Sequence, residues 1–460
     1  MAGLALLSVV TVACGSSPAT TMRPAPKGLP RFYSVPQPLP AGPPGTLIKD
    51  QKVASDGLHG TVYRVMYTSE SVRNTPVAVT GLVIVPDTPP PPGGYPVVSW
   101  GHGTNGMADS CAPSLDPSQA VPETNGLLAQ GWEVTASDYQ GEGTPGLLPY
   151  IVGVSAARNT IDIVRAARQI RAAHASADYV VWGHSEGGQT AMFSLHIGPT
   201  YAPDLHMRGV VAGAPPSQFN LIYDFLKTSP YRYYLFMAAG GYNAAYGNRA
   251  APLSEVLTPL GMRLLPDLDK GCADYLARVV DRYTIAQIAK GDPFTVPAWR
   301  KLFMENDPED FAVASPVPLL IIQGGADEQI PVVSTELLAQ HLCGVGQDLE
   351  RWIYPGQSHA GVIGPSFDDM VHWIKDRFAG VADPDPYAPT GLAHVATTTC
   401  PSGGGPPPGR RRPAPPVGDR RWTPPPPAPA WGRPPWDTWP RSRRKGCPTW
   451  SRAASPSTAR

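Results

Sequence analysis

The sequence predicts an α/β fold, in which a mostly parallel central sheet carries a helical insertion, and three patterns support this fold class. Residues 58–67 alternate apolar and polar side chains, which is typical of a half-buried strand, and the apolar run at 81–85 is expected to pair with it. Several continuously apolar runs follow, and such runs are typical of parallel strands that are covered on both faces. A long segment without clear strands, at about 217–314, then interrupts the series.

Six continuously apolar runs are expected to form the core of the sheet. They are Pro96–Trp100, Trp132–Ser137, Tyr179–Trp182, Gly209–Gly213, Leu319–Gln323 and Arg351–Tyr354. Residues 155–173 lie between the second and third runs. Their apolar residues, among them Ile161, Val164 and Ile170, fall on one helical face, which predicts a helix. Antiparallel strands followed by alternating strands and helices indicate a mixed α/β sheet.

The interrupting segment, at about 217–314, holds several helix-like stretches that are rich in Tyr and Phe. An insertion of this size between two core strands predicts a separate cap. The cap is interpreted either as a lid over an apolar pocket or as a helical decoration, and we favour the lid.

The first 14 residues predict an export signal. Leu4–Val12 is an apolar run that is too short to span a bilayer. Thr11–Cys14 is similar to a bacterial lipoprotein box, in which Cys14 is acylated and becomes the mature N-terminus, and an ordinary cleaved signal is the alternative. The chain is therefore expected to be secreted, or to be held at the cell envelope by a lipid anchor in the membrane. No other run reaches the length of about 18 apolar residues that a membrane span requires.

The two ends of the chain differ in composition from its centre. Residues 15–45 are rich in Pro, Ser and Gly and are expected to form a spacer before a folded domain at 46–400. Residues 401–460 hold seventeen Pro, eleven Arg and five of the eleven Trp, with a net charge of +10. We expect this tail to be disordered. We hypothesise that it is translated out of frame, and a natural basic tail that binds a surface is the alternative.

The charge of the rest of the chain bears on the kind of partner. Because the whole chain has a formal charge of zero, the first 400 residues sum to about −10. An acidic surface argues against a nucleic acid partner. Nothing in the sequence indicates an obligate protein partner.

Six cysteines in an exported chain indicate disulfides. Cys14 is assigned to lipidation and Cys447 lies in the tail. The remaining four, which permit three pairings, are Cys111, Cys272, Cys343 and Cys400. No CxxC or His-rich spacing suggests a metal site, and neither a metal nor an organic cofactor is predicted.

The strongest chemical signal is the motif Gly183-His184-Ser185-Glu186-Gly187, which lies between an apolar run and a segment that can begin a helix. A nucleophile on a sharp strand-to-helix turn needs an exposed hydroxyl, and the crowded backbone requires glycines two residues to either side. The start of the helix adds positive potential beneath a developing oxyanion. Ser185 is therefore the predicted nucleophile.

A nucleophilic serine needs a base and an acid that orients the base, in the chain order Ser, acid, His. Asp327 and His359 each follow a buried run, so both are expected in loops at the carboxyl ends of strands. His359 would accept the proton of Ser185 and return it to the leaving alkoxide, while Asp327 would hold the imidazole in the required tautomer. Glu328 is the alternative acid, and His372 is expected to pack within a helix.

An oxyanion hole requires two backbone N–H groups. One is expected from Glu186, the residue after the nucleophile, and the other from the glycine-rich loop after the first apolar run. In that loop either Gly103 or Thr104 is expected to point inward, and His102 is interpreted as a structural hydrogen-bonding residue. The loop 138–143 either supports this hole or is a surface turn.

With these motifs in place, the chain resembles the secretory lipase family of bacteria and fungi over about residues 30–400. The resemblance implies an α/β-hydrolase fold in which a triad works under a large helical lid, on triacylglycerols and other long-chain esters. It also implies the disulfides Cys111–Cys272 and Cys343–Cys400, the second of which would place the end of the domain near Cys400. The segments that carry the resemblance are Gly183–Gly187, the cap, Gly325–Asp327, Ser358-His359 and Cys111–Ser114.

The predicted activity is hydrolysis of apolar acyl esters through an acyl-Ser185 intermediate, with a lipid ester as the substrate. Among enzymes, a serine peptidase or amidase and an acyltransferase on the same fold are the alternatives. A non-catalytic lipid-binding surface protein is a third class, which the combination of Ser185, Asp327 and His359 disfavours because a binding protein needs none of them.

Overall fold

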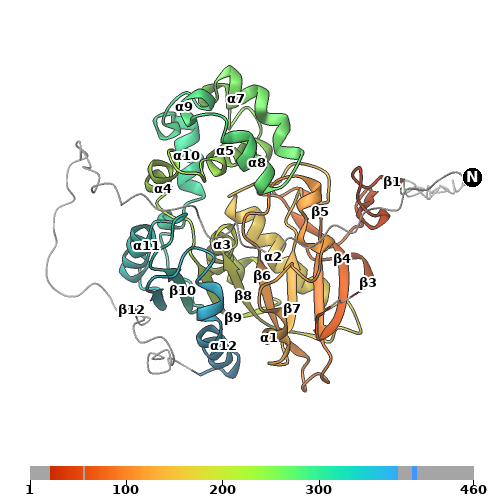
Figure 1. Cartoon of the computed structure of the whole chain (residues 1–460). Coiled ribbons are helices and arrows are strands. Elements are labelled where there is room, and N and C mark those ends of the chain that lie inside the picture. Colours follow the sequence, from red (N-terminus) through yellow and green to blue (C-terminus); the bar gives the residue numbers. More distant parts are fainter. Residues whose placement is uncertain (1–20, 55–56, 382–395, 401–460) are drawn as a thin grey trace, which may run out of the picture. The chain divides into compact units, whose positions relative to one another are not determined.

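The computed structural model describes residues 21–54, 57–381 and 396–400. Its main feature is a ten-stranded sheet with the strand order β12-β11-β10-β9-β8-β6-β7-β5-β4-β3 (Figure 1). Strands β6 to β11 run parallel to one another, β3 to β5 extend one edge in antiparallel fashion, and β12 is antiparallel at the other edge. The bounds are β3 (Leu47–Val53), β4 (Gly60–Glu70), β5 (Pro76–Pro86), β6 (Tyr95–Gly101), β7 (Glu133–Ser137), β8 (Ala175–His184), β9 (His206–Gly213), β10 (Leu319–Gly324), β11 (Leu349–Tyr354) and β12 (Ala396–Cys400).

Helices cover both faces of the sheet. Alternate residues of a strand point to opposite faces, so a continuously apolar strand presents two apolar faces that must both be buried. Val180 packs with residues of α1 and α12 on one face, whereas Val181 packs with residues of α2, α3 and α11 on the other. Burial on both faces explains why the parallel strands are continuously apolar in sequence. These helices are α1 (Thr124–Leu128), α2 (Gly153–Ala167), α3 (Glu186–Tyr201), α11 (Val332–Gly344) and α12 (Ile363–Ala379).

The segment between β9 and β10 forms a helical cap that lies over one end of the sheet (Figure 1). All of its residues are described, and they form helices but no strand. Phe236, Tyr242 and Trp299 of the cap are fully buried, in an apolar cluster that is shared with Met107 and Tyr139 of the loops beneath it. Its α-helices are α4 (Phe219–Leu226), α5 (Tyr233–Tyr246), α6 (Leu253–Val256), α7 (Pro259–Leu264), α8 (Ala273–Val280), α9 (Ile285–Ile288) and α10 (Pro297–Glu305).

Short 3-10 helices connect several of these elements. Three precede α1 and three lie in the cap. They are η1 (Arg31–Tyr33), η2 (Asp109–Cys111), η3 (Pro113–Leu115), η4 (Leu265–Asp269), η5 (Pro293–Thr295) and η6 (Pro308–Asp310). The loop with η2 and η3 follows β6 and carries Cys111, whose disulfide with Cys272 ties this loop to the cap.

The segment before β3 is folded in its described part. Strands β1 (Thr21–Arg23) and β2 (Val35–Gln37) pair in a small antiparallel sheet. Tyr33 is fully buried, and its hydroxyl lies 2.7 Å from that of Ser114. The prediction of a spacer over 15–45 is therefore wrong for the described part, because an aromatic anchor holds this Pro-rich segment to a residue 81 positions further along the chain.

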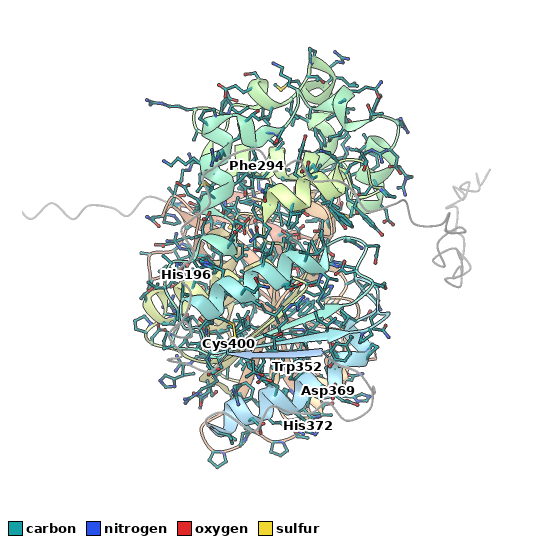
Figure 2. All side chains as sticks on the ribbon, turned by 90° about the vertical axis from the view of Figure 1, so that its left-hand side faces the viewer. His196, Phe294, Trp352, Asp369, His372 and Cys400 are labelled. Atoms are coloured by element: carbon teal, nitrogen blue, oxygen red, sulfur yellow. A yellow bond between two sulfur atoms is a disulfide. The ribbon has the colours of Figure 1, made fainter. Side chains whose placement is uncertain are left out.

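Strand β12 lies beside β11 at the last edge of the sheet, where Cys400 is paired with Leu349 (Figure 2). The disulfide Cys343–Cys400 joins this strand to α11. His372 lies in α12 as predicted, but its side chain is exposed and not packed, because it points away from the sheet and its Nδ1 donates to the carbonyl oxygen of Asp368 at 2.8 Å.

Two predicted segments cannot be placed on this fold. The export signal at 1–14, with Cys14, and the tail at 401–460, with Cys447, lie outside the described residues. None of the helices in the described part of the chain is both long and apolar enough to cross a membrane.

Candidate active site

Ser185 occupies the sharp turn between β8 and α3. Its φ of 62° and ψ of −121° are strained for a residue with a side chain, and its backbone N–H donates to the Gly213 carbonyl at 2.8 Å. The flanking glycines are required by contact: a Cβ on Gly183 would lie 2.0 Å from the Gly187 oxygen, and a Cβ on Gly187 would lie 1.8 Å from the Gly101 oxygen. The predicted crowding around the serine is therefore present, and a bulkier residue at either glycine would force the turn apart.

His359 and Asp327 lie together at the carboxyl ends of β11 and β10. Nδ1 of His359 lies 2.9 and 3.0 Å from the two carboxylate oxygens of Asp327, and the imidazole is almost fully buried. Burial acts to raise the pKa of Asp327, but the hydrogen bond and charge of His359, with two backbone N–H donors, hold it below its ordinary value. Asp327 is thus an ionised acceptor that keeps the proton of the imidazole on Nδ1.

Glu328 is not the partner of the imidazole ring. One of its oxygens accepts the backbone N–H of His359 at 3.0 Å, and the other accepts the hydroxyl of Tyr231 at 3.3 Å. Glu328 therefore holds the loop that carries His359, while Asp327 contacts the ring itself.

Nε2 of His359 is buried and makes no hydrogen bond to another described residue. The ring of His184, the residue before the nucleophile, lies against the same imidazole with 4.6 Å between ring centroids. His359 is thereby placed next to the nucleophile turn with its acceptor nitrogen available. In the absence of substrate, catalytic hydrogen bonds are often long and tighten only when substrate binds.

The oxyanion loop runs alongside the nucleophile. A Cβ added to Gly103 would lie 3.6 Å from the Cβ of Ser185, so this backbone passes in direct contact with the serine. The Thr104 hydroxyl lies 2.9 Å from that of Tyr150. Glu186 begins α3 directly after the serine. The structure therefore brings the predicted donors Gly103, Thr104 and Glu186 to one place.

The side chain of Glu186 is buried beneath this loop. Burial raises its pKa to about 8, and a hydrogen bond with the Thr104 side chain opposes part of that rise. At neutral pH the carboxyl is therefore protonated and adds no negative charge beneath the oxyanion hole.

The loop 138–143 is buried, which excludes the alternative of a surface turn. Asp138 is fully buried and accepts hydrogen bonds from the Thr80 hydroxyl and the Ser114 N–H, both at 2.7 Å. The Tyr139 ring stacks on His102 with 4.1 Å between centroids, and its hydroxyl donates to the His102 carbonyl. The loop therefore supports the oxyanion loop from behind.

An apolar pocket opens from the nucleophile into the cap. Ser185 and Glu186 lie at its polar end, and the cap supplies most of its wall. This arrangement can hold an apolar group covalently attached at Ser185. The wall includes Ile222, Tyr234, Phe236, Tyr242, Ile288 and Trp299.

Sequence reasoning did not identify the residues that hold the cap against the nucleophile helix. Gln189 in α3 donates to the carbonyl of Asn306 at 2.7 Å, and the Asn306 side chain accepts the N–H of Gly153 at 3.1 Å. These contacts join residues more than 100 positions apart, so no local motif in the sequence predicts them. In the described residues no group of three or more His, Cys, Asp or Glu side chains is arranged to hold a metal ion.

Residues 97–385 match the family described as secretory lipase. The chain belongs to the secretory lipase family. This match spans more than half of the chain and includes Ser185, Asp327 and His359. The prediction of family membership made from the sequence motifs is therefore confirmed.

Individual relatives share little sequence identity with this chain, but they match most of its length. Secreted triacylglycerol lipase LIP4 of Malassezia globosa is 24% identical over 372 residues, which cover 73% of this chain and 78% of that protein. "Probable inactive lipase MT1628" of Mycobacterium tuberculosis is 25% identical over 372 residues, which cover 76% of this chain and 82% of that protein. The structure is similar to Candida antarctica lipase A in its closed state, with a TM-score of 0.64 at 20% identity over 74% of this chain and 84% of that one. The predicted α/β-hydrolase fold is confirmed by this likeness.

Proposed function

We propose that this secretory lipase family member hydrolyses carboxylic esters with apolar acyl groups, with Ser185 as its nucleophile. The observation that carries the proposal is the strained nucleophile turn, which lies beside the Asp327–His359 pair and opens into an apolar pocket. Family membership alone does not establish activity, since one relative is named a probable inactive lipase. The complete set of Ser185, Asp327 and His359 supports an active enzyme.

The reaction follows from the roles of these three residues. Oγ of Ser185 attacks the ester carbonyl carbon while its proton passes to Nε2 of His359, and Asp327 stabilises the imidazolium that forms. The bond to the alcohol oxygen then breaks, and His359 gives its proton to the leaving alkoxide. A water molecule next loses a proton to His359 and attacks the acyl-Ser185 ester, which releases the carboxylic acid and restores the serine.

The substrate class follows from the pocket. Its wall is built from aliphatic and aromatic side chains of the cap, and burying an acyl chain there gains roughly 0.8 kcal/mol for each methylene group. We therefore propose triacylglycerol-type esters, which agrees with the name of the Malassezia globosa relative.

The test is hydrolysis of p-nitrophenyl esters of increasing acyl length by the full chain, beside Ser185→Ala and a matched control. Ser254→Ala removes an exposed cap serine that is not part of the pocket wall. The expected result is a rate that rises toward long acyl chains, is lost in Ser185→Ala and is kept in Ser254→Ala. Activity confined to acetate and butyrate esters would overturn the long-chain proposal, and activity that survives Ser185→Ala would overturn the nucleophile.

Secretion agrees with the secretory lipase family and with the Malassezia globosa relative, which is named a secreted lipase. We further propose that the exported protein is anchored by acylation of Cys14, a residue outside the described part of the chain. Mass spectrometry of the mature N-terminal peptide tests this: a diacylglyceryl group on Cys14 that is absent in Cys14→Ser is expected, and a peptide that begins without lipid after an ordinary cleavage would contradict it.

A further inference from the structure

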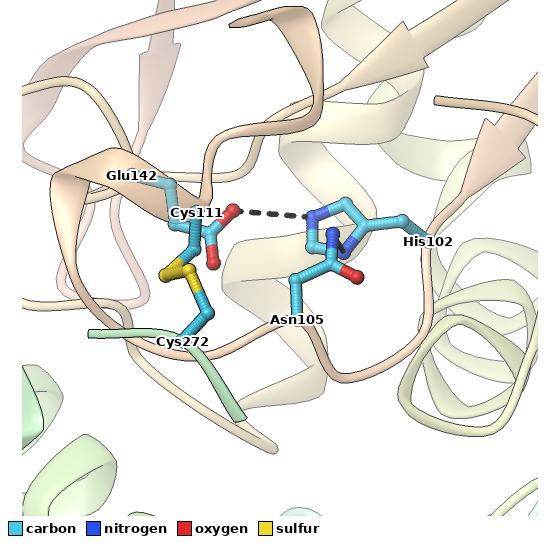
Figure 3. The surroundings of a disulfide bond; sticks show 5 residues. All are labelled: His102, Asn105, Cys111, Glu142 and Cys272. Atoms are coloured by element: carbon cyan, nitrogen blue, oxygen red, sulfur yellow. Dashed lines mark hydrogen bonds and ion pairs between the residues drawn. A yellow bond between two sulfur atoms is a disulfide. The ribbon is translucent and has the colours of Figure 1, made fainter. Parts of the chain in front are cut away.

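His102 lies between the oxyanion loop and the buried side chain of Glu142 (Figure 3). The imidazole is almost fully buried, and it is fixed from one side by the stacked ring of Tyr139. Its two ring nitrogens face different partners. Nδ1 lies 2.8 Å from the carbonyl oxygen of Gly103, and Nε2 lies 3.6 Å from a carboxyl oxygen of Glu142.

The contact with Gly103 determines which nitrogen carries the proton. A carbonyl oxygen can only accept, so Nδ1 must donate to it. The side-chain nitrogen of Asn105 lies 3.3 Å from the same Nδ1 (Figure 3), and two donors cannot bond to each other. Because the oxygen and nitrogen of an amide are interchangeable by a flip of the group, a protonated Nδ1 requires the flipped amide, whose oxygen would accept from it. Burial lowers the pKa of His102 to about 4, so the ring is neutral at pH 7 and Nε2 presents a lone pair.

Glu142 completes the arrangement on the other side of the ring. Both of its carboxyl oxygens are buried and have no hydrogen-bond partner among the described residues. Burial, with smaller contributions from nearby acidic groups, raises the pKa of Glu142 well above its ordinary value. With Nδ1 donating to Gly103, the lone pair of Nε2 faces this carboxyl at 3.6 Å, and burial favours the neutral form of Glu142, which complements that lone pair.

The hydrogen bond from His102 to Gly103 also orients the peptide bond between Gly103 and Thr104 in the oxyanion loop. The carbonyl of Gly103 and the N–H of Thr104 belong to the same planar trans peptide, so they point in opposite directions. Because the carbonyl is held by His102, the N–H of Thr104 points away from that ring. This N–H makes no hydrogen bond to another described residue, and the peptide begins at a glycine in contact with Ser185.

We propose that Glu142 and His102 are positioning residues that fix the Gly103–Thr104 peptide, so that the N–H of Thr104 serves as the second donor of the oxyanion hole. This inference rests on the proposed ester hydrolysis at Ser185. The sequence leaves open whether Gly103 or Thr104 supplies the second donor, and this inference selects Thr104. It also gives Glu142, a buried acid of the loop 138–143, a role.

The first test separates the hydrogen bond of His102 from its bulk. His102→Asn keeps an N–H near the position of Nδ1, whereas His102→Phe keeps the ring stacked on Tyr139 but loses the donor. The oxyanion hole acts on the transition state, so His102→Phe is expected to lower kcat on a long-chain p-nitrophenyl ester by roughly 100-fold, with KM changed less than about threefold. His102→Asn is expected to recover at least about tenfold of that loss.

The second test addresses Glu142 and remains decisive if a His102 variant fails to fold. Glu142→Gln keeps a donor toward Nε2, whereas Glu142→Leu removes it, so the Gln variant is expected to retain at least about tenfold more kcat than the Leu variant. Glu133→Leu is the matched control, because Glu133 is an equally buried carboxyl, has no hydrogen-bond partner in the described part of the chain and lies at the opposite, amino-terminal end of β7.

The outcomes separate this inference from the proposed function. Equal kcat in His102→Phe and the unaltered chain, or equal losses in Glu142→Gln and Glu142→Leu, would overturn the positioning role while ester hydrolysis stands. A kcat loss in Glu133→Leu as large as that in Glu142→Leu would also overturn it, since the effect would then be one of general stability. An unaltered chain without Ser185-dependent hydrolysis would overturn both proposals.

Discussion

Asp307 accepts a hydrogen bond from the backbone N–H of Phe219 at 2.7 Å, although 88 residues separate the two along the chain. The same carboxylate accepts the hydroxyl of Ser217 and the N–H of Gln218. Residues 217–219 begin the cap, and Asp307 lies near its end. One buried side chain therefore closes the base of the cap.

Replacing Asp307 with Ala is expected to destabilise the protein by about 2–4 kcal/mol, because the backbone N–H groups of Gln218, Phe219 and Glu309 would lose their acceptor. Urea unfolding of the purified protein measures this. Glu305→Ala is the matched control, since its exposed carboxylate makes only a surface contact with Lys301 at 3.7 Å. Equal stability of the two variants would show that the base of the cap is held by other contacts.

Replacing Asp327 with Asn is expected to lower kcat by about 10⁴-fold, because the amide would favour the wrong tautomer of His359. Glu328→Gln is expected to cost less than about tenfold, since its side-chain oxygen can still accept the backbone N–H of His359. Steady-state hydrolysis of one ester measures both. The reverse order of losses would assign the acid to Glu328.

The pH dependence of activity is expected to report on Glu186. Its pKa is raised to about 8, so the carboxyl becomes charged as the pH rises through that value, and an anion beneath the oxyanion hole opposes the negative charge of the transition state. The kcat of the unaltered chain should therefore fall above about pH 8, and Glu186→Gln should lose this decline. A decline of the same size in Glu186→Gln would mean that another group causes it.

The same group affects stability with a definite sign. Because the pKa of Glu186 is raised in the folded state, its contribution to stability is complete below the ordinary pKa of a glutamate and is lost as the pH rises to about 8. Unfolding midpoints measured from pH 5 to pH 9 should fall less in Glu186→Gln than in the unaltered chain. Parallel pH dependences in the two proteins would contradict this assignment.

The two disulfides are expected to differ in their effect on stability. Cys111–Cys272 closes a sequence separation of 161 residues and Cys343–Cys400 one of 57, so chain entropy assigns about 1 kcal/mol more to the first. Urea unfolding of the two double Cys→Ser variants measures the difference. A larger loss for the variant that lacks Cys343–Cys400 would mean that the packing of β12, rather than loop closure, dominates.

The parts of the fold that could be predicted are those whose local composition reflects burial. The six apolar runs lie in the six parallel strands, because strands covered on both faces have no polar side. Strand β3 gave no such signal, since Lys49–Lys52 includes exposed polar residues at one edge of the sheet. The helix predicted over 155–173 ends at Ala167 in the structure, because the chain turns there toward β8.

The residues of the candidate site also divide into those that local sequence motifs predict and those that only the folded structure reveals. Ser185, Asp327 and His359 could be assigned because each follows a strand in a short motif, and the structure brings them to one edge of the sheet. The contacts of Glu142 with His102 and of Asp307 with Phe219 could not be assigned, because they depend on how distant segments pack. Burial of a carboxyl is a property of the folded chain, and the residues next to it in sequence do not predict it.

The attachment of the cap limits how such enzymes can be recombined. The insertion between β9 and β10 is continuous in sequence, yet Cys272 is bonded to Cys111, and the N–H of Ala273 donates to the carbonyl of Asn105 at 2.7 Å. A chimaera whose insertion lacked a cysteine at the position of Cys272 would leave Cys111 unpaired next to the oxyanion loop. The disulfide therefore makes the oxyanion loop and the cap one covalent unit, and a cap exchange should carry the loop that holds Cys111 with it.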